Sequence, residues 1–344
     1  MVSMDFKSHL NISVIIPLFN KVEHIRQAIH SVLEQSRGPE EVIVVDDAST
    51  DGGDRVVEEY ATSVRLIRRP HTGVSAARNF GIEMAKGDVI AFLDADDFWK
   101  PHFLETVSSL LVRFPQACTA ASAYEWIIKP GHIKRFPFAG IPSYPWEGTI
   151  DYFACMAGKG APPLHSSGVL ARRATLRQIG GFPIGVRWGE DHDTWVRLAL
   201  AGDVAFTNEV LFTVNVIASN RATESQSPRP LLPAAVMIME ALTKTDDEAR
   251  RKNLRKYLER LVFNSATINL RYSHLALARD QLMQYRKLSG LGPRWFLLVC
   301  CSFLPKGMIR ILGILRKCIL ISIQSITRAQ SRSWKSSLVR RSSN

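Results

Sequence analysis

The first hundred residues alternate short apolar runs with segments of helical periodicity. The apolar runs have the length and β-branched content of buried strands, and they lie at Ile12–Pro17, Glu41–Asp46, Val64–Arg68 and Val89–Leu93. Between these runs, apolar residues recur every three or four positions, as on helices that cover a sheet. This alternation predicts right-handed crossover units, and therefore a Rossmann-like, mostly parallel α/β sheet flanked by helices.

Three carboxylates, those of Asp94, Asp96 and Asp97, directly follow the fourth apolar run. Like charges at this spacing raise one another's pKa unless a positive charge compensates them. A divalent cation that carries the phosphates of a substrate would provide that charge. Because open α/β sheets bind ligands outside the carboxyl ends of their strands, we expect a metal and a nucleotide here. Alternatively, these acids simply cap the following helix.

Polar residues also follow the first two runs, at the same expected edge of the sheet. Asp46 and Asp47 come after the second run, and one of them can accept a hydrogen bond from the ring N–H of uracil or guanine. Pro17 and Asn20 end the first run beside them. The structural alternative is that the aspartates cap the turn at residues 48–52 and Asn20 caps the next helix.

Arg78 lies on an expected helix, Val74–Ala85, that begins with small residues. Small residues permit close approach of the backbone, and a guanidinium in this position can pair with a diphosphate. The alternative is a surface arginine in an ion pair within its own helix.

Six motifs stand in a fixed order along the chain. They occupy residues 14–20, 44–52, 73–81, 92–97, 180–182 and 188–191. In this order they resemble glycosyltransferase family 2, the inverting enzymes with a GT-A fold. The resemblance covers about residues 10–215. It implies transfer of a sugar from a nucleotide-diphosphate sugar, with Mg²⁺ or Mn²⁺ as cofactor.

The resemblance also implies roles for individual residues in a donor site. The loop of Pro17 and Asn20 lines the nucleotide base, and Asp47 is favoured over Asp46 for binding that base. Arg78 and Asn79 belong to the donor site.

In the resembling family the carboxylates of the Asp94–Asp97 motif bind ribose and metal. Asp96 is the candidate metal ligand, and Asp94 is expected on the ribose or a metal-bound water, so that both belong to the expected metal site. Many relatives carry a histidine after the last strand, but residues 210–220 contain none, which leaves the third protein ligand open. The isolated His165 and His192 receive no role.

The resemblance gives the catalytic base to Asp191, in the first turn of an expected helix over residues 190–201. A base would take the proton of the acceptor hydroxyl as its oxygen attacks the anomeric carbon. The alternative is that Glu190, Asp191 and Asp193 only complement the helix dipole. That dipole would lower the pKa of Asp191, whereas a nearby diphosphate would raise it.

The net charge of +12 is concentrated near the C-terminus. Residues 250–344 hold 20 Lys and Arg against 2 Asp and Glu, whereas the first 249 residues hold 24 against 30. We expect a catalytic domain over residues 1–220, a linker over 221–245 and a basic helical region over 246–344. Residues 295–328 combine apolar and basic helical faces, which predicts peripheral contact with an anionic membrane.

The expected location is the cytoplasmic face of a membrane. Residues 1–10 lack the apolar core of a secretory signal. Five cysteines without paired spacing favour a reducing compartment. The acceptor would then be a saccharide or lipid-linked saccharide of a cell-surface polysaccharide. Three alternatives remain: an inactive nucleotide-sugar-binding protein, a nucleotidyltransferase, and a nucleic-acid-binding protein, the last disfavoured by the large apolar face of the tail.

Overall fold

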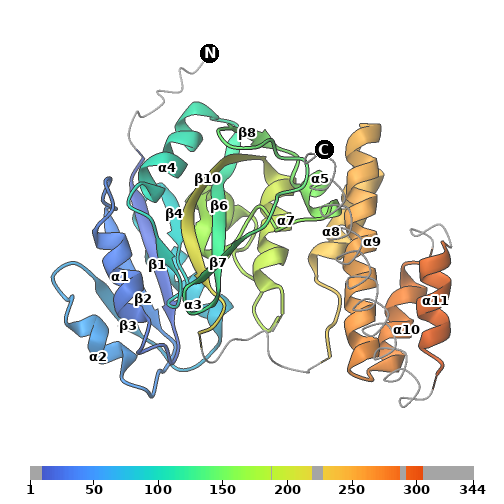
Figure 1. The fold of residues 1–344 in the computed structure, drawn as a ribbon, viewed down its shortest axis with the longest axis horizontal. Coiled ribbons are helices and arrows are strands. Elements are labelled where there is room, and N and C mark those ends of the chain that lie inside the picture. Colours follow the sequence, from blue (N-terminus) through green and yellow to red (C-terminus); the bar gives the residue numbers. More distant parts are fainter. Residues whose placement is uncertain (1–9, 187, 219–227, 287–291, 305–344) are drawn as a thin grey trace, which may run out of the picture. The chain divides into compact units, whose positions relative to one another are not determined.

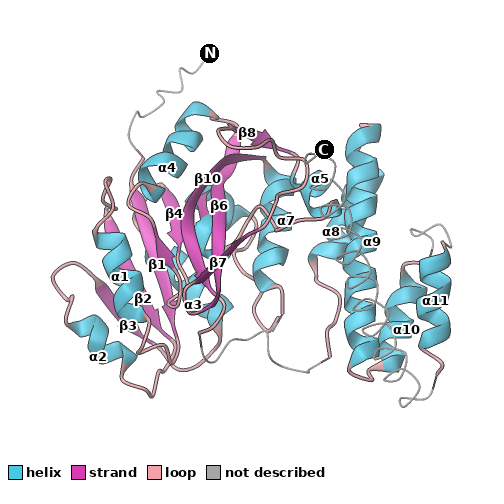
Figure 2. Ribbon diagram, viewed as in Figure 1, coloured by secondary structure: helices cyan, strands magenta, loops and turns pink. Residues whose placement is uncertain are grey.

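The computed structural model describes residues 10–186, 188–218, 228–286 and 292–304. The chain forms two compact units, the first from residues 1–225 and 232–258, and the second from residues 226–231 and 259–344. The first unit carries the strands, and the described part of the second is built from helices (Figure 2).

A ten-stranded sheet forms the centre of the first unit (Figure 1). Its order is β3-β2-β1-β4-β9-β6-β10-β5, with β7 paired to β6 and β8 paired to β10. The strands are β1 (Ile12–Leu18), β2 (Glu41–Asp46), β3 (Arg65–Arg68), β4 (Val89–Phe92), β5 (Phe98–Trp99), β6 (Ala117–Lys129), β7 (His132–Arg135), β8 (Glu147–Ile150), β9 (Val169–Arg172) and β10 (Asp203–Asn215). The first four confirm the four expected strands.

The sheet is mixed, and so less parallel than expected. Strands β1 to β4 pair in parallel, as does β6 with β10, but β9 lies antiparallel between β4 and β6. The 3₁₀ turn η1 (Ser166–Gly168) explains this reversal. Ser167 in that turn accepts a hydrogen bond from the backbone N–H of Asp94, just beyond the end of β4. The chain therefore enters β9 from the edge where β4 ends and must run the opposite way.

Helices cover both faces of the sheet. They are α1 (Ile25–Leu33), α2 (Gly53–Glu58), α3 (Val74–Met84), α4 (Phe103–Arg113), α5 (Tyr152–Ala157), α6 (Arg173–Gln178), α7 (Glu190–Ala201) and α8 (Ala234–Lys244). Val14 and Ile16 share a core cluster with the apolar faces of α1 and α4. Ile15, whose side chain points to the opposite face, meets α3 at Gly81.

The packing of α3 on β1 depends on the missing side chain of Gly81. A Cβ at this position would lie 2.6 Å from Cγ2 of Ile15, too close for a side chain of any size. On the same face, Phe92 of β4 contacts the rings of Phe182 and Trp195. The sequence pattern of α3 therefore brings Arg78 and Asn79, on the same helix, close to the sheet.

Two regions are more ordered than the sequence indicated. Residues 127–165, a stretch rich in proline, glycine and aromatic residues, contain the end of β6 together with β7, β8 and α5. The range expected as a linker, residues 221–245, contains α8, whose residues Ala234, Ala235 and Ile238 are buried. The carboxylate of Asp193 in α7 accepts a hydrogen bond from the N–H of Ala234 at 2.6 Å, so α8 packs against α7 within the first unit.

Helix α9 (Glu248–Arg271) runs from the first unit into the second, which continues with α10 (Leu275–Gln284) and α11 (Pro293–Cys301). In the second unit, Asn269 is buried and its side chain binds the main-chain N–H and C=O of Arg229 at 2.8 Å each. The indole of Trp295 donates to the carbonyl of Leu282 at 2.9 Å and fastens α11 to α10. Among the described helices, none is both long enough and apolar enough to cross a membrane.

Candidate active site

The candidate site lies at one edge of the sheet, where β1, β2 and β4 end. These three strands are parallel neighbours, with β1 in the middle. Their following loops therefore lie side by side and carry most of the residues predicted from the sequence. Helices α3 and α7 add Arg78 and Asp191.

The loops after β1 and β2 are joined through Asn20. This residue has φ of 51°, in the left-handed region that asparagine tolerates better than most residues. Its side-chain oxygen accepts a hydrogen bond from the N–H of Thr50 at 2.8 Å, and its own N–H donates to Ser49 Oγ at 3.0 Å. Pro17 is buried within β1, opposite Val45. Asn20 thus fixes the loop instead of capping α1.

Asp46 and Asp47 are both buried but have different partners. Asp46 accepts a hydrogen bond from the N–H of Ser49 at 3.1 Å, which is the turn-capping alternative. Asp47 reaches towards the loop before α3, where it accepts from the N–H groups of Thr72 and Gly73 at 2.8 Å each. His71 Nδ1 lies 2.9 Å from the same carboxylate.

Aromatic rings stand beside Asp47. The ring of Phe19 is 42% exposed and stacks on His71 with a centroid separation of 4.4 Å. Stacked, partly exposed rings next to a carboxylate are suited to hold a planar base. His71 was not predicted from the sequence, since no spacing relates it to Phe19 or Asp47.

Arg78 is buried and joins the end of β4 to the start of α7. Its Nη2 donates to Asp94 at 2.7 Å and its Nη1 to Glu190 at 3.3 Å, while its guanidinium lies 5.0 Å from the centroid of Phe182. Burial alone would lower the pKa of Arg78, but Asp94 and Glu190 outweigh it and raise the pKa. Arg78 therefore keeps its charge, and the surface-pair alternative is wrong because the side chain is only 3% exposed.

Asn79, next to Arg78 on α3, contacts the main chain of Phe182. Its amide donates to the carbonyl of Phe182 at 2.8 Å and accepts from the N–H of Phe182 at 2.7 Å. Both of its polar atoms are thus used to hold the loop that contains Gly181, where any Cβ would lie 2.4 Å from the Asn79 side chain. These contacts indicate that Asn79 positions this loop, and its expected place in the donor site stays a prediction.

Each carboxylate of the Asp94–Asp97 motif has its own ion-pair or hydrogen-bond partners. Asp94 is paired with Arg78, and Asp96 lies 2.8 Å from Nζ of Lys21. Asp97 is buried and accepts hydrogen bonds from Ser167 Oγ and from the N–H of Asn215. Burial and the charges of Asp96 and Asp94 raise the pKa of Asp97 well above its usual value. Asp97 therefore holds β10 and η1 in place.

The chemistry of this donor set suits a hard divalent cation, which prefers carboxylate oxygens. Asp94 and Asp96 are partly exposed, with side-chain exposures of 28% and 15%. No cluster of three or more acidic, histidine or cysteine side chains that could hold a metal is found among the described residues. Two carboxylates fit a metal whose remaining ligands come from a diphosphate and water.

Asp191 begins α7 within a group of titratable side chains. Burial alone would raise its pKa, but His192, Arg78 and the N–H of His192, which donates to Oδ1 at 2.7 Å, outweigh burial and lower the pKa. Burial and Asp191 raise the pKa of the adjacent Glu190. The lowered pKa keeps the carboxylate of Asp191 ionised at neutral pH, as a base requires.

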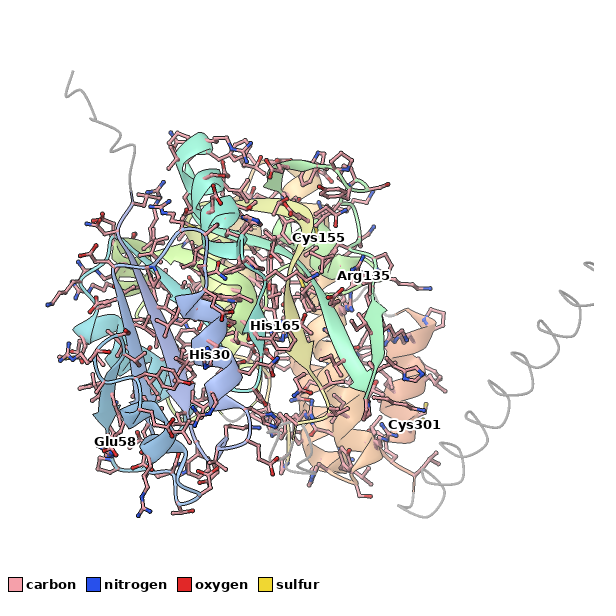
Figure 3. All side chains as sticks on the ribbon, turned by 60° about the vertical axis from the view of Figure 1, so that its left-hand side comes forward. His30, Glu58, Arg135, Cys155, His165 and Cys301 are labelled. Carbon is pink, nitrogen blue, oxygen red and sulfur yellow. The ribbon has the colours of Figure 1, made fainter. Side chains whose placement is uncertain are left out.

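His165 interacts electrostatically with this group, although the sequence indicated no role for it. Figure 3 labels His165 among the side chains of the first unit. Its Nδ1 accepts a hydrogen bond from the N–H of Ser167 at 3.2 Å, which leaves the ring proton on Nε2. Its ring packs against Tyr124 and Phe212. Burial lowers the pKa of His165, with Asp94 and Asp191 opposing. About seventy residues separate it from Asp94, so no local signal could have linked them.

These features define a GT-A type α/β fold, and comparisons with known proteins agree. The profile of Glycosyl transferase family 2 matches residues 13–179 of the chain. The fold is shared with TarS of S. aureus in complex with UDP-GlcNAc, with a TM-score of 0.65, 18% identity and 84% of both chains covered.

A mannosyltransferase from Pyrobaculum calidifontis, solved with GDP-Man and Mn²⁺, has a TM-score of 0.54 at 19% identity, covering 86% of this chain and 80% of its own. An uncharacterized glycosyltransferase of Nostoc sp. is 40% identical over 186 residues, which are 52% of this chain and 56% of that protein. The putative teichuronic acid biosynthesis glycosyltransferase TuaG of Bacillus subtilis is 41% identical over 98 residues, or 27% of this chain and 39% of its own. The chain thus spans about half the length of the first of these curated relatives and about two fifths of the second.

Proposed function

We propose that this protein is an inverting, metal-dependent glycosyltransferase that uses a nucleotide-diphosphate sugar. The observation that carries this is the meeting of Asp47, Asp94 and Asp96 at one sheet edge, with the buried cation Arg78 behind them. A polar edge of this kind suits a nucleotide, its ribose and its diphosphate.

The donor's base would lie against the ring of Phe19, near Asp47. Because backbone N–H groups and His71 already occupy the carboxylate of Asp47, base binding would rearrange the His71 contact. Pro17, Asn20 and Asp46 would shape this part of the site from behind. Arg78 would hold Asp94 in position for the ribose and lend positive charge to the diphosphate side.

Asp96, with Asp94 beside it, would hold Mg²⁺ or Mn²⁺. When bound, such an ion neutralises the phosphate charge of the leaving nucleoside diphosphate. The Pyrobaculum mannosyltransferase, which shares this fold and was solved in complex with Mn²⁺, supports this assignment.

Asp191 would act as the base for inversion. Its carboxylate would accept the proton of the acceptor hydroxyl while that oxygen bonds to the anomeric carbon and the bond to the diphosphate breaks. The lowered pKa of Asp191 keeps this carboxylate ionised. Glu190 is less suited to the role because Arg78 already binds it.

The acceptor would be a saccharide or lipid-linked saccharide of a bacterial surface polysaccharide. The teichuronic acid role in the name of TuaG supports this. Peripheral contact with the cytoplasmic face of a membrane would suit such an acceptor. Phe296, Leu297 and Phe303, in or just after α11, are 66%, 62% and 66% exposed, and Arg279 lies over the ring of Phe303. The basic stretch expected over residues 305–328 lies outside the described residues.

The test is release of nucleoside diphosphate from a panel of nucleotide sugars in detergent, with Mn²⁺ or Mg²⁺. We expect wild type to turn over one donor, and Asp96→Ala to lose the metal-dependent reaction. Asp191→Asn should still bind this donor but react about 10²–10⁴-fold more slowly. Asp203→Asn, at an exposed acid where β10 begins, is the matched control and should behave as wild type.

The outcomes separate the competing functions. Donor binding by calorimetry without turnover, even with acceptors added, would favour an inactive nucleotide-sugar-binding protein. Release of pyrophosphate from a nucleoside triphosphate and a sugar phosphate would favour a nucleotidyltransferase. Flotation with anionic, but not neutral, liposomes tests the membrane contact separately.

A further inference from the structure

Lys21 is the cationic partner of Asp96, the carboxylate assigned above to a divalent metal. Its Nζ lies 2.8 Å from Oδ2 of Asp96, and the two side chains are only 11% and 15% exposed. An ion pair this shielded from solvent is screened less by salt than a surface pair. The attraction between Lys21 and Asp96 is therefore weakened less by salt than that of a surface ion pair.

The backbone of Lys21 is fixed from both sides. The preceding residue, Asn20, is tied to the loop after β2 through Ser49 and Thr50. The carbonyl of Lys21 accepts the N–H groups of His24 and Ile25 at 3.0 Å, where α1 begins. The loop after β2 and the start of α1 thus hold the backbone of Lys21, so that its side chain reaches Asp96. The pairing does not depend on a mobile surface side chain.

The two neighbouring acids have partners other than Lys21, so Lys21 balances the negative charge of Asp96. Asp94 is paired with Arg78, and Asp97 is bound by Ser167 and the backbone of Asn215. A metal that binds Asp96 must therefore compete with an ammonium group already in contact with it. Two cations cannot share a carboxylate at this distance without strong mutual repulsion.

We propose that Lys21 and the divalent metal are alternative partners of Asp96, so that metal binds weakly until the donor arrives. This rests on the proposed function for the presence of a metal. The diphosphate of the donor gives the ammonium of Lys21 a new anionic partner. An open cavity of about 250 Å³ adjoins Lys21 and is also lined by Asn20 and Thr50. Metal and donor would then bind cooperatively, each raising the affinity for the other.

The experiment measures Mn²⁺ binding to the full chain without any nucleotide, by the electron paramagnetic resonance signal of free Mn²⁺. We expect Lys21→Met to bind Mn²⁺ about tenfold more tightly than wild type, within the usual range of coupling between sites. Lys21→Arg keeps the charge and should match wild type. The double variant Lys21→Met, Asp96→Asn should lose the gain.

Lys100→Met is the matched control, because Lys100 also pairs with a buried carboxylate, that of Glu125, at 3.0 Å. It should leave Mn²⁺ affinity unchanged. Lys21→Gln gives a second measurement of Mn²⁺ affinity if the methionine variant unfolds, as judged by its melting temperature in EDTA.

Mn²⁺ binding by Lys21→Met and Lys21→Gln that is equal to or weaker than that of wild type, or undetectable, would overturn the proposal. Donor turnover is assayed separately, so this result would leave the glycosyltransferase assignment standing. Conversely, Lys21→Met could bind Mn²⁺ more tightly while the protein turns over no donor. That result would support competition between Lys21 and the metal for Asp96, and would contradict only the proposed glycosyltransferase activity.

Discussion

Arg78 Nη2 donates a hydrogen bond to Asp94 Oδ1 at 2.7 Å, and the same guanidinium reaches Glu190 at the start of α7. One side chain thus links a helix, a strand end and the helix that carries Asp191. Because it is 3% exposed, its removal would leave two acids without their cation inside the protein.

We therefore expect Arg78→Met to lower the free energy of unfolding by about 3–5 kcal/mol, as when one partner of a buried ion pair is removed. Arg78→Lys should recover part of this loss, since a single ammonium cannot bridge both acids in the same way. Urea denaturation measures the effect. Arg68→Met, in a half-exposed ion pair with Asp54, is the control and should change stability far less. Equal losses in the two methionine variants would contradict the bridging role.

The position of Asn79 predicts a loss of stability and not a direct loss of donor contact. Asn79→Ala removes both hydrogen bonds to the buried main chain of Phe182 and should cost about 1–3 kcal/mol in urea denaturation. Asn253→Ala, which removes an exposed hydrogen bond to Asp151, is the control. If Asn79→Ala kept full stability but lost donor affinity in calorimetry, the expectation drawn from the sequence would be right and the positioning role wrong.

The buried His165 predicts a particular dependence of stability on pH. Burial lowers the pKa of His165 below its unfolded value of about 6.5, so folding favours the neutral ring. This stabilisation is complete above the unfolded pKa and is lost as pH falls through 6.5 towards the folded pKa. Wild type should therefore lose more stability than His165→Phe between about pH 6.5 and 5. The groups facing the ring include Asp94, Asp191, His192 and Arg78.

Thermal unfolding at a series of pH values gives this comparison. His132→Gln, at an exposed histidine of β7, should follow the wild-type profile. Parallel pH profiles for wild type and His165→Phe would show that His165 does not carry the effect.

The cysteines should differ in reactivity according to burial. Burial raises the pKa of Cys118 and of Cys155 to about 11, so almost no thiolate forms at pH 8. Cys300 is exposed on α11. In the native protein a disulfide reagent should label Cys300 rapidly, and Cys118 and Cys155 only after unfolding. Peptide mapping by mass spectrometry, with Cys300→Ser as control, identifies the sites. Rapid native labelling of Cys118 would argue against its burial.

The local sequence was sufficient for much of the fold. The runs at β1, β2 and β4 are buried on both faces. Asp47 follows β2, and Asp94 and Asp96 follow β4. Because parallel strands bring their carboxyl ends to one edge, the meeting of these loops could be predicted without coordinates. The helical spacing of α3 likewise placed Arg78 near the sheet.

Relations between distant residues could not be predicted in this way. The reversal of β9, the packing of α8, and the contacts of Asn79, His71 and His165 all depend on partners far away in the sequence. The pairing of Lys21 with Asp96 spans 75 residues and depends on the turn at Asn20.

The sequence by itself determined the strands and helices of the first hundred residues and which charged groups stand at their ends, because strand and helix periodicity and turn chemistry act over a few neighbouring residues. Only the tertiary structure decided which charge compensates which. Hydrogen-bond and ion-pair partners are chosen by the distance between side chains in space, and that distance is set when the whole sheet and its covering helices have packed.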